Sequence, residues 1–317
     1  MQDAPVRAKG AAPWGATVLT AAEVRRRALA PFTDKAGTFA PLKTATFALL
    51  AAPWVWLAWA YATDNLGGFP LKALLNETGL WGIRFIVLTL AVTPLRRILQ
   101  WPKLVTLRRM IGIAAFAYSA VHLWIYVPYM AYDFGRIGSE IVLRFYLLVG
   151  TLAVLAMVPL AMTSTDAIVK RLGGARWRRL HQLVYAVGIL AMLHFYLLLA
   201  KLQTPEAQIL AGLLIWLLAY RLLYAWRGTM PTPWLLVLSV GAAILTMGAE
   251  ATFYGISSGG RIPVSAVLGA NFSFESGIRP AWVILGLGLA VTLAGWVRDR
   301  MSPPRERRRG PQLEAAS

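Results

Sequence analysis

Residues 177–196 read WRRLHQLVYAVGILAMLHFY, a basic collar followed by an apolar segment with one histidine at its start and another deep inside. The chain of 317 residues has three histidines: His181 and His194 lie in this stretch, and His122 lies inside another apolar run. Ionisable side chains are costly within a membrane and usually mark a functional site. The sequence therefore indicates that these histidines act as ligands.

The composition is that of an integral membrane protein. Hydrophobic residues make up 58% of the chain and charged residues only 15%, whereas soluble domains have about 25% charged residues. The net charge of +18 does not indicate nucleic-acid binding, because the basic residues lie between the apolar segments and no nucleic-acid-binding motif accompanies them. The absence of cysteine excludes cysteine-ligated iron–sulfur clusters and covalently attached haem.

Eight apolar segments are long enough to cross a bilayer, which takes about 20 residues of helix. We therefore expect an all-α membrane protein with spans near 43–62, 80–99, 110–132, 143–162, 181–200, 207–226, 234–250 and 280–297. Pro94 is expected to end the second span, because proline cannot continue a helix without losing a hydrogen bond.

Basic residues gather in alternate loops. They follow the second, fourth and sixth spans and fill the C-terminal tail, for example Arg108, Arg109, Arg178, Arg179, Arg227 and Arg305, whereas the other loops carry acids such as Asp64 and Glu140. Loops rich in Lys and Arg remain in the cytoplasm. The sequence therefore predicts a multi-pass protein with both termini cytoplasmic.

Two of the histidines are predicted to lie at the same depth. His122 is 13 residues after Arg109 and His194 is 15 residues after Arg179, which at 1.5 Å per residue is about 20 Å and 22 Å from the cytoplasmic edge. Their spans run in the same direction, so the two imidazoles are level and can bind one haem iron from opposite faces. The alternative is a pair of structural histidines bonded to hydroxyls or to each other.

His181 lies only about 3 Å inside Arg179 and is therefore interfacial. It precedes His194 by 13 residues, about 20 Å along a helix, which would suit a second redox centre. Thirteen residues rotate an ideal helix by about 220°, so either the helix bends near His181 or this residue has another role.

Several motifs give the chain a family resemblance. They are LTLAVTPL at 88–95, RRMIG at 108–112 followed by His122, LAMTST at 160–165, and RLG at 171–173 followed by Trp177, Leu180, His181, Tyr185, His194 and Tyr196. With these motifs the sequence resembles the MsrQ family, the haem-binding membrane subunits of a bacterial methionine sulfoxide reductase system, within the ferric-reductase-like transmembrane group.

The resemblance implies a ferric reductase-like bundle of six core helices with two additional C-terminal ones. It divides the chain into a polar leader (1–42), the haem-binding core (43–227), an additional helix pair with a periplasmic loop (228–300) and a basic tail (301–317).

The resemblance also implies cofactors: one or two haem b groups, and FMN. His122 and His194 would hold the outer haem and His181 the inner one. The wider group has a fourth histidine where this sequence has Arg108, so an inner haem would lack that ligand. Arg108 and Arg109 would hold a haem propionate or a flavin phosphate, although anchoring at the membrane surface explains these arginines equally well.

The implied function is electron transfer across the bacterial inner membrane. Electrons would come from the quinone pool or a cytoplasmic flavin reductase and pass to MsrP, the periplasmic molybdenum-containing reductase that repairs oxidised methionines, as its partner in a heterodimer. No catalytic residue is expected on this chain, and no G-x-G-x-x-G nicotinamide site is visible. The alternatives are a transmembrane ferric or cupric reductase, a proton-coupled transporter that uses the histidines, and a simple membrane anchor.

Overall fold

The computed structural model describes residues 32–33, 38–202, 205–274 and 277–301. Most of the predicted leader and nearly all of the predicted basic tail lie outside these residues. The chain divides into two compact units, residues 1–55 and 56–317. The first unit contains the start of α2 (Pro41–Ala62), where Lys43 donates a hydrogen bond to the carbonyl oxygen of Thr33 at 2.9 Å.

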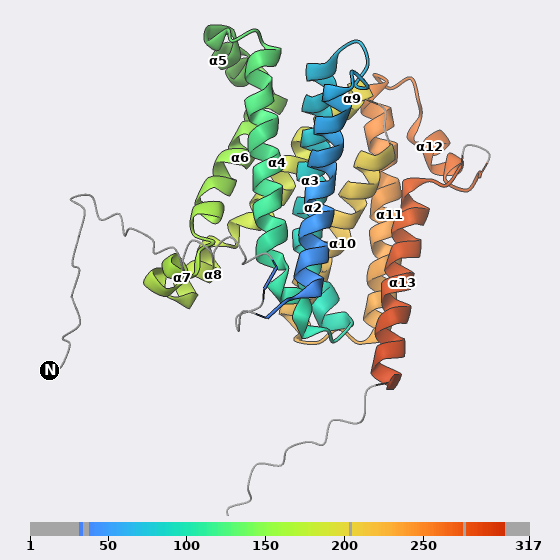
Figure 1. Cartoon of the computed structure of the whole chain (residues 1–317). Helices are drawn as coiled ribbons and strands as arrows, with labels where there is room; N and C mark the ends of the chain where they lie inside the picture. Colours follow the sequence, from blue (N-terminus) through green and yellow to red (C-terminus); the bar gives the residue numbers. More distant parts are fainter. Residues whose placement is uncertain (1–31, 34–37, 203–204, 275–276, 302–317) are drawn as a thin grey trace, which may run out of the picture. The chain divides into compact units, whose positions relative to one another are not determined.

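Within the described residues, eight helical segments are long and apolar enough to cross a membrane, as the sequence predicts. Figure 1 shows these long helices and the short ones between them. After α2 the long helices are α3 (Pro70–Ile98), α4 (Arg108–Tyr129), α6 (Phe145–Met162), α9 (Leu183–Leu202), α10 (Pro205–Arg227), α11 (Thr232–Ser257) and α13 (Pro280–Met301). The predicted all-α membrane fold is confirmed.

Short helices join several of the long ones: η1 (Pro102–Thr106), α5 (Phe134–Leu143), α7 (Asp166–Leu172), α8 (Gly174–Leu180) and α12 (Val264–Ala270). Polar side chains begin two of them. The carboxylate of Asp133 accepts the backbone N–H of Arg136 at 2.9 Å to cap α5, and the hydroxyl of Thr165 accepts that of Ile168 at 3.4 Å to cap α7. In Figure 1, α5 lies at one end of the bundle, and α7 and α8 lie toward the other.

Small residues let the core helices of the second unit approach closely. Helix α3 packs against α4, and α6 packs against α9. A Cβ added at Gly82 of α3 would lie 2.9 Å from the hydroxyl of Ser119 on α4, and one at Gly188 of α9 would lie 3.1 Å from Leu90. A methyl group at either position would require the neighbouring side chain to move, so glycine allows these helices to approach this closely.

The C-terminal pair packs on α10 in the same way, and α11 and α13 run side by side in Figure 1. A Cβ at Gly212 of α10 would meet Thr246 of α11 at 2.5 Å and Ile284 of α13 at 2.6 Å. A Cβ at Gly288 of α13 would meet the hydroxyl of Ser239 at 2.4 Å. The pair is therefore packed into the second unit as closely as the core helices are.

The prediction that Pro94 ends the second span is wrong. Helix α3 continues past Pro94 to Ile98. Proline lacks an N–H, so the carbonyl oxygen of Leu90, four residues earlier, loses its helical donor. The guanidinium of Arg221 on α10 donates to that oxygen instead. A donor from another helix thus satisfies the carbonyl, and the helix can continue.

Candidate redox-cofactor site

The rings of His122 and His194 lie next to each other inside the bundle, nearly at right angles. His122 comes from α4 and His194 from α9, and their ring centroids are 6.3 Å apart with an angle of 74° between the ring planes. The sequence predicts that the two imidazoles share one depth, and the structure brings them together.

Each of these rings is held by a backbone carbonyl of a neighbouring helix. Nδ1 of His122 lies 2.8 Å from the carbonyl oxygen of Leu75 on α3, and Nδ1 of His194 lies 2.6 Å from that of Tyr146 on α6. A carbonyl oxygen can only accept, so Nδ1 carries the proton in both rings. Nε2 therefore keeps its lone pair, which is the arrangement that metal-binding histidines use.

A glycine makes room for each ring one helical turn beyond the accepting carbonyl. A Cβ on Gly79 would lie 2.8 Å from Nδ1 of His122, and a Cβ on Gly150 would lie 2.6 Å from Nδ1 of His194. The two pairs follow one pattern, because Gly79 is four residues after Leu75 and Gly150 is four residues after Tyr146. Any larger residue would push the ring away from its carbonyl.

The spacing of the rings fits one iron held between them. Imidazole nitrogens bind metals such as zinc at about 2.0–2.1 Å, and the ring centroid lies about 1.2 Å behind the nitrogen, so two rings on opposite sides of one metal ion would have centroids about 6.4–6.6 Å apart. In the described part of the chain, no group of three or more His, Asp or Glu side chains could hold a bare metal ion. Two histidines alone suit haem, because the porphyrin supplies the remaining ligands.

His181 has a different environment. It follows α8, and the turn at residues 181–182 separates α8 from α9, so the helix is interrupted at this point. Its Nε2 is 3.1 Å from Oγ1 of Thr163, whose own proton is donated to the carbonyl oxygen of Pro159 at 2.6 Å. His181 therefore donates from Nε2, and a ligand role for that nitrogen requires this bond to break.

Trp177 fixes the His181 ring in place. The two rings stack with centroids 4.0 Å apart, and the indole N–H of Trp177 donates to the carbonyl oxygen of Thr163 at 3.0 Å. In this structure the imidazole of His181 is therefore held by a hydroxyl and by a stacked ring.

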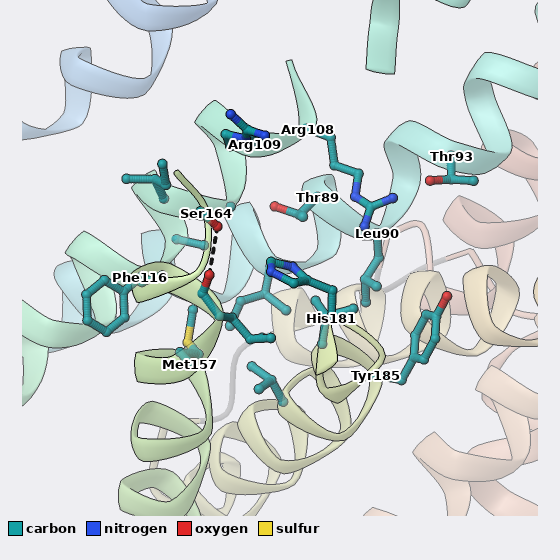
Figure 2. Close-up of a pocket in the computed structure, with 18 of the residues that line it drawn as sticks. Thr89, Leu90, Thr93, Arg108, Arg109, Phe116, Met157, Ser164, His181 and Tyr185 are labelled. Carbon is teal, nitrogen blue, oxygen red and sulfur yellow. Dashed lines mark hydrogen bonds between the residues drawn. The ribbon is translucent and has the colours of Figure 1, made fainter. Parts of the chain in front are cut away.

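A pocket of about 290 Å³ lies beside His181, at the smaller end of the usual range for ligand sites. Figure 2 shows Arg108 extending from α4 toward the part of the pocket where His181 and Tyr185 lie. The lining comes from α3, η1, α4, α6, α8, α9 and α10 and from the turns that follow α6 and α8. Its polar members include Thr89, Thr93, Arg108, Arg109, Ser164, His181, Tyr185 and Arg221. We call this cavity the inner pocket.

Cations dominate the charge of the inner pocket. Arg109 is paired with Asp166 at 2.5 Å, but no carboxylate lines the pocket itself. Of the ion pairs among the described residues, none includes Arg108 or Arg221. The pocket therefore suits an anionic group.

Sequence reasoning missed Arg221 as a pocket residue. An arginine near the end of a span is normally interpreted as one of the positive charges that keep that end in the cytoplasm. Arg221 bonds to the carbonyl oxygens of Leu217, at 2.8 Å, and of Leu90, and its guanidinium lies 5.3 Å from the ring centroid of Tyr185. The sequence did contain an indication of this role: an arginine in one membrane-spanning helix and a proline, which leaves a carbonyl without its donor, in another.

Comparison with known proteins identifies a family over the middle of the chain. The family described as "Ferric reductase like transmembrane component" matches residues 78–192, a range that contains His122 and His181 and ends two residues before His194. No solved structure matches the chain.

Curated relatives cover a longer stretch, and each is named "Protein-methionine-sulfoxide reductase heme-binding subunit MsrQ". The Rhodospirillum rubrum protein is 41% identical over 186 residues, which is 58% of this chain and 89% of the relative. The Caulobacter vibrioides protein is 40% identical over 169 residues, covering 52% and 80%. The Xanthomonas campestris pv. campestris protein is 42% identical over 186 residues, covering 56% and 84%. At this identity and coverage, the chain belongs to the MsrQ family.

Proposed function

We propose that this protein is a b-type cytochrome that carries electrons across the bacterial inner membrane for a methionine sulfoxide reductase. The observation that carries the proposal is the pair His122 and His194, whose centroids are 6.3 Å apart and whose Nδ1 atoms are each bonded to a carbonyl. The name shared by its relatives, a heme-binding subunit, agrees with that geometry.

His122 and His194 would hold the outer haem from its two faces. The haem supplies one-electron chemistry when bound, and the protein adjusts its potential through the axial ligands and burial. The carbonyls of Leu75 and Tyr146 would increase the electron density on the ligating nitrogens. The haem would be bound without a covalent link, because the chain has no cysteine for attachment, and this supports the assignment of haem b.

The inner pocket would hold the anionic part of a second redox cofactor. Both candidates, a second haem and FMN, carry such a group: a propionate or a phosphate. Arg108, Arg109 and Arg221 supply the charge, and His181 supplies a nitrogen ligand once Thr163 releases it. Because Arg108 stands where a fourth histidine would be needed, an inner haem would have one histidine ligand at most.

The charge pattern supports one orientation of the protein in the membrane. With the basic loops in the cytoplasm, the inner pocket would lie near the cytoplasm and the His122–His194 pair toward the periplasm, and electrons would pass outward from the first to the second. The donor would be the quinone pool or a cytoplasmic flavin reductase, and the acceptor would be MsrP in a heterodimer. Sulfoxide reduction and protein repair would occur on that partner, so this chain would bear no catalytic residue for them.

A reduced-minus-oxidised absorption spectrum of the purified protein tests the haem assignment. We expect a low-spin b-type spectrum for the wild type and its loss in His122→Ala and in His194→Ala. Trp124→Ala is the matched control, because it removes a large ring from the same helix at a position that is 71% exposed. Wild-type spectra from both histidine variants would overturn the ligand assignment.

The match to ferric reductase-like proteins favours a second candidate, a reductase of ferric or cupric ions. The pre-reduced protein should pass electrons to MsrP and not to chelated iron or copper if our proposal holds. Rapid metal reduction without any partner supports the second candidate. The proton-coupled transporter predicts a colourless protein, so the same spectrum rejects it.

A further inference from the structure

A second cleft, of about 550 Å³, opens where α3 and α10 end. Its lining comes from the last turns of these two helices and from the links that follow them: Arg96, Arg97, Ile98, Gln100, Pro102, Tyr220, Tyr224, Gly228, Thr229 and Met230. It has no lining residue in common with the inner pocket. We call it the α3–α10 cleft.

Arg96 and Arg97 make this cleft cationic. Neither residue belongs to any ion pair among the described residues. A nearby acid is Asp299 of α13, which accepts a hydrogen bond from the amide of Gln100 at 2.5 Å. Asp299 does not itself line the cleft, so the charge of the lining is that of the two arginines.

Aromatic rings hold one of these cations in position. The guanidinium carbon of Arg97 lies 3.8 Å from the ring centroid of Tyr224, and the rings of Tyr224 and Tyr220 stack at 6.1 Å. An arginine placed over an aromatic face keeps its N–H donors at the edge of its plane, where they can pair with an oxyanion. Ile98, Pro102 and Met230 add apolar surface.

The cleft lies at the depth of lipid headgroups. Arg96 and Arg97 are in the last turn of the α3 span, and Tyr224 is in the last turn of the α10 span. Tyrosine and arginine are typical of the membrane–water interface. One wall, Gly228 to Met230, is the link into α11, so the segment that leads into the additional helix pair helps to build the cleft.

We propose that the α3–α10 cleft binds the phosphate headgroup of an anionic membrane lipid. Two arginines that line one cleft match a phosphate in charge, and basic pockets between membrane helices are known to bind anionic headgroups. The rings and apolar side chains would accept the glycerol and the start of the acyl chains. The bound lipid would then join the ends of α3 and α10 to the C-terminal pair.

Native mass spectrometry of the full-length protein, titrated with phosphatidylglycerol or phosphatidylcholine, tests this proposal. We expect phosphatidylglycerol to bind more tightly by on the order of tenfold, since each arginine near an anionic headgroup contributes a several-fold gain. Arg96→Gln/Arg97→Gln should remove the preference. Thr229→Trp should also remove it by filling the cleft without changing any charge.

The control Lys170→Gln/Arg171→Gln removes the same charge from α7, outside the cleft, and should keep the preference. Equal binding of both lipids by the wild type, or an unchanged preference in the cleft variants, would overturn the proposal. Inorganic phosphate is the probe for a soluble ligand. If it binds the wild type but not the variants while phosphatidylglycerol shows no preference, the cleft serves a soluble phosphate compound and the lipid assignment is wrong.

Discussion

The guanidinium of Arg221 donates a hydrogen bond to the carbonyl oxygen of Leu90, across the interface between α10 and α3. That oxygen is free because Pro94, four residues later, has no N–H to offer it. A proline in one span thus provides the acceptor for an arginine in another. The pairing fixes a cation at the wall of the inner pocket.

Arg221→Gln should weaken the binding of the second cofactor and leave the outer haem intact. A hydrogen bond to a charged group contributes about 1.5–3 kcal/mol, so the dissociation constant should rise on the order of 10- to 100-fold. Haem and flavin quantified per protein give the readout. Arg227→Gln is the control, because Arg227 is exposed on the same helix and does not line the pocket. Unchanged cofactor content in Arg221→Gln would remove this residue from the site.

Gly150→Ala and Gly79→Ala should each displace a histidine ring. The added Cβ would lie 2.6 Å from Nδ1 of His194 in the first and 2.8 Å from Nδ1 of His122 in the second. We expect low-spin haem absorption to shift or disappear in both variants. Gly248→Ala is the control, because a Cβ there meets nothing within 4 Å and alanine favours a helix over glycine by about 1 kcal/mol. Normal spectra in both test variants would contradict the packing described above.

Thr163→Val distinguishes a ligand role of His181 from a structural one. The substitution removes the hydroxyl that accepts the Nε2–H of His181 and leaves the side chain nearly the same size. If His181 is a ligand of the second cofactor, the occupancy of that cofactor should rise in Thr163→Val and fall in His181→Ala. If the role is structural, both variants should lower the melting temperature and leave cofactor content unchanged.

Arg279→Met should destabilise the C-terminal pair. Arg279 is paired with Glu250 at 3.2 Å, and the side chain of Glu250 is only 1% exposed. Removing the cation leaves a buried carboxylate without a counter-charge, which costs about 3–5 kcal/mol. Thermal unfolding in detergent should show a clear drop in Tm, whereas Arg261→Met, at an exposed position of the same loop, should not. The double variant Glu250→Gln/Arg279→Met should recover part of the loss.

The sequence alone predicts the spans and the level of His122 and His194. Hydropathy and loop charge are properties of short segments, and a helix rises by a constant amount per residue, so depth can be counted. The prediction that the second span ends at Pro94 is wrong because it considers only the hydrogen bonds within that span. The missing hydrogen bond is replaced by Arg221, which lies 127 residues later in the chain.

Only the tertiary structure decides which groups meet. Each histidine is held by groups from other segments of the chain. The rings of His122 and His194 depend on the carbonyls of Leu75 and Tyr146, and His181 is held by the hydroxyl of Thr163. The space for the first two rings is left by Gly79 and Gly150. The α3–α10 cleft likewise needs the link after α10 to lie beside the end of α3. Such contacts depend on how helices rotate and pack against one another, and the residue pattern of a single segment determines neither.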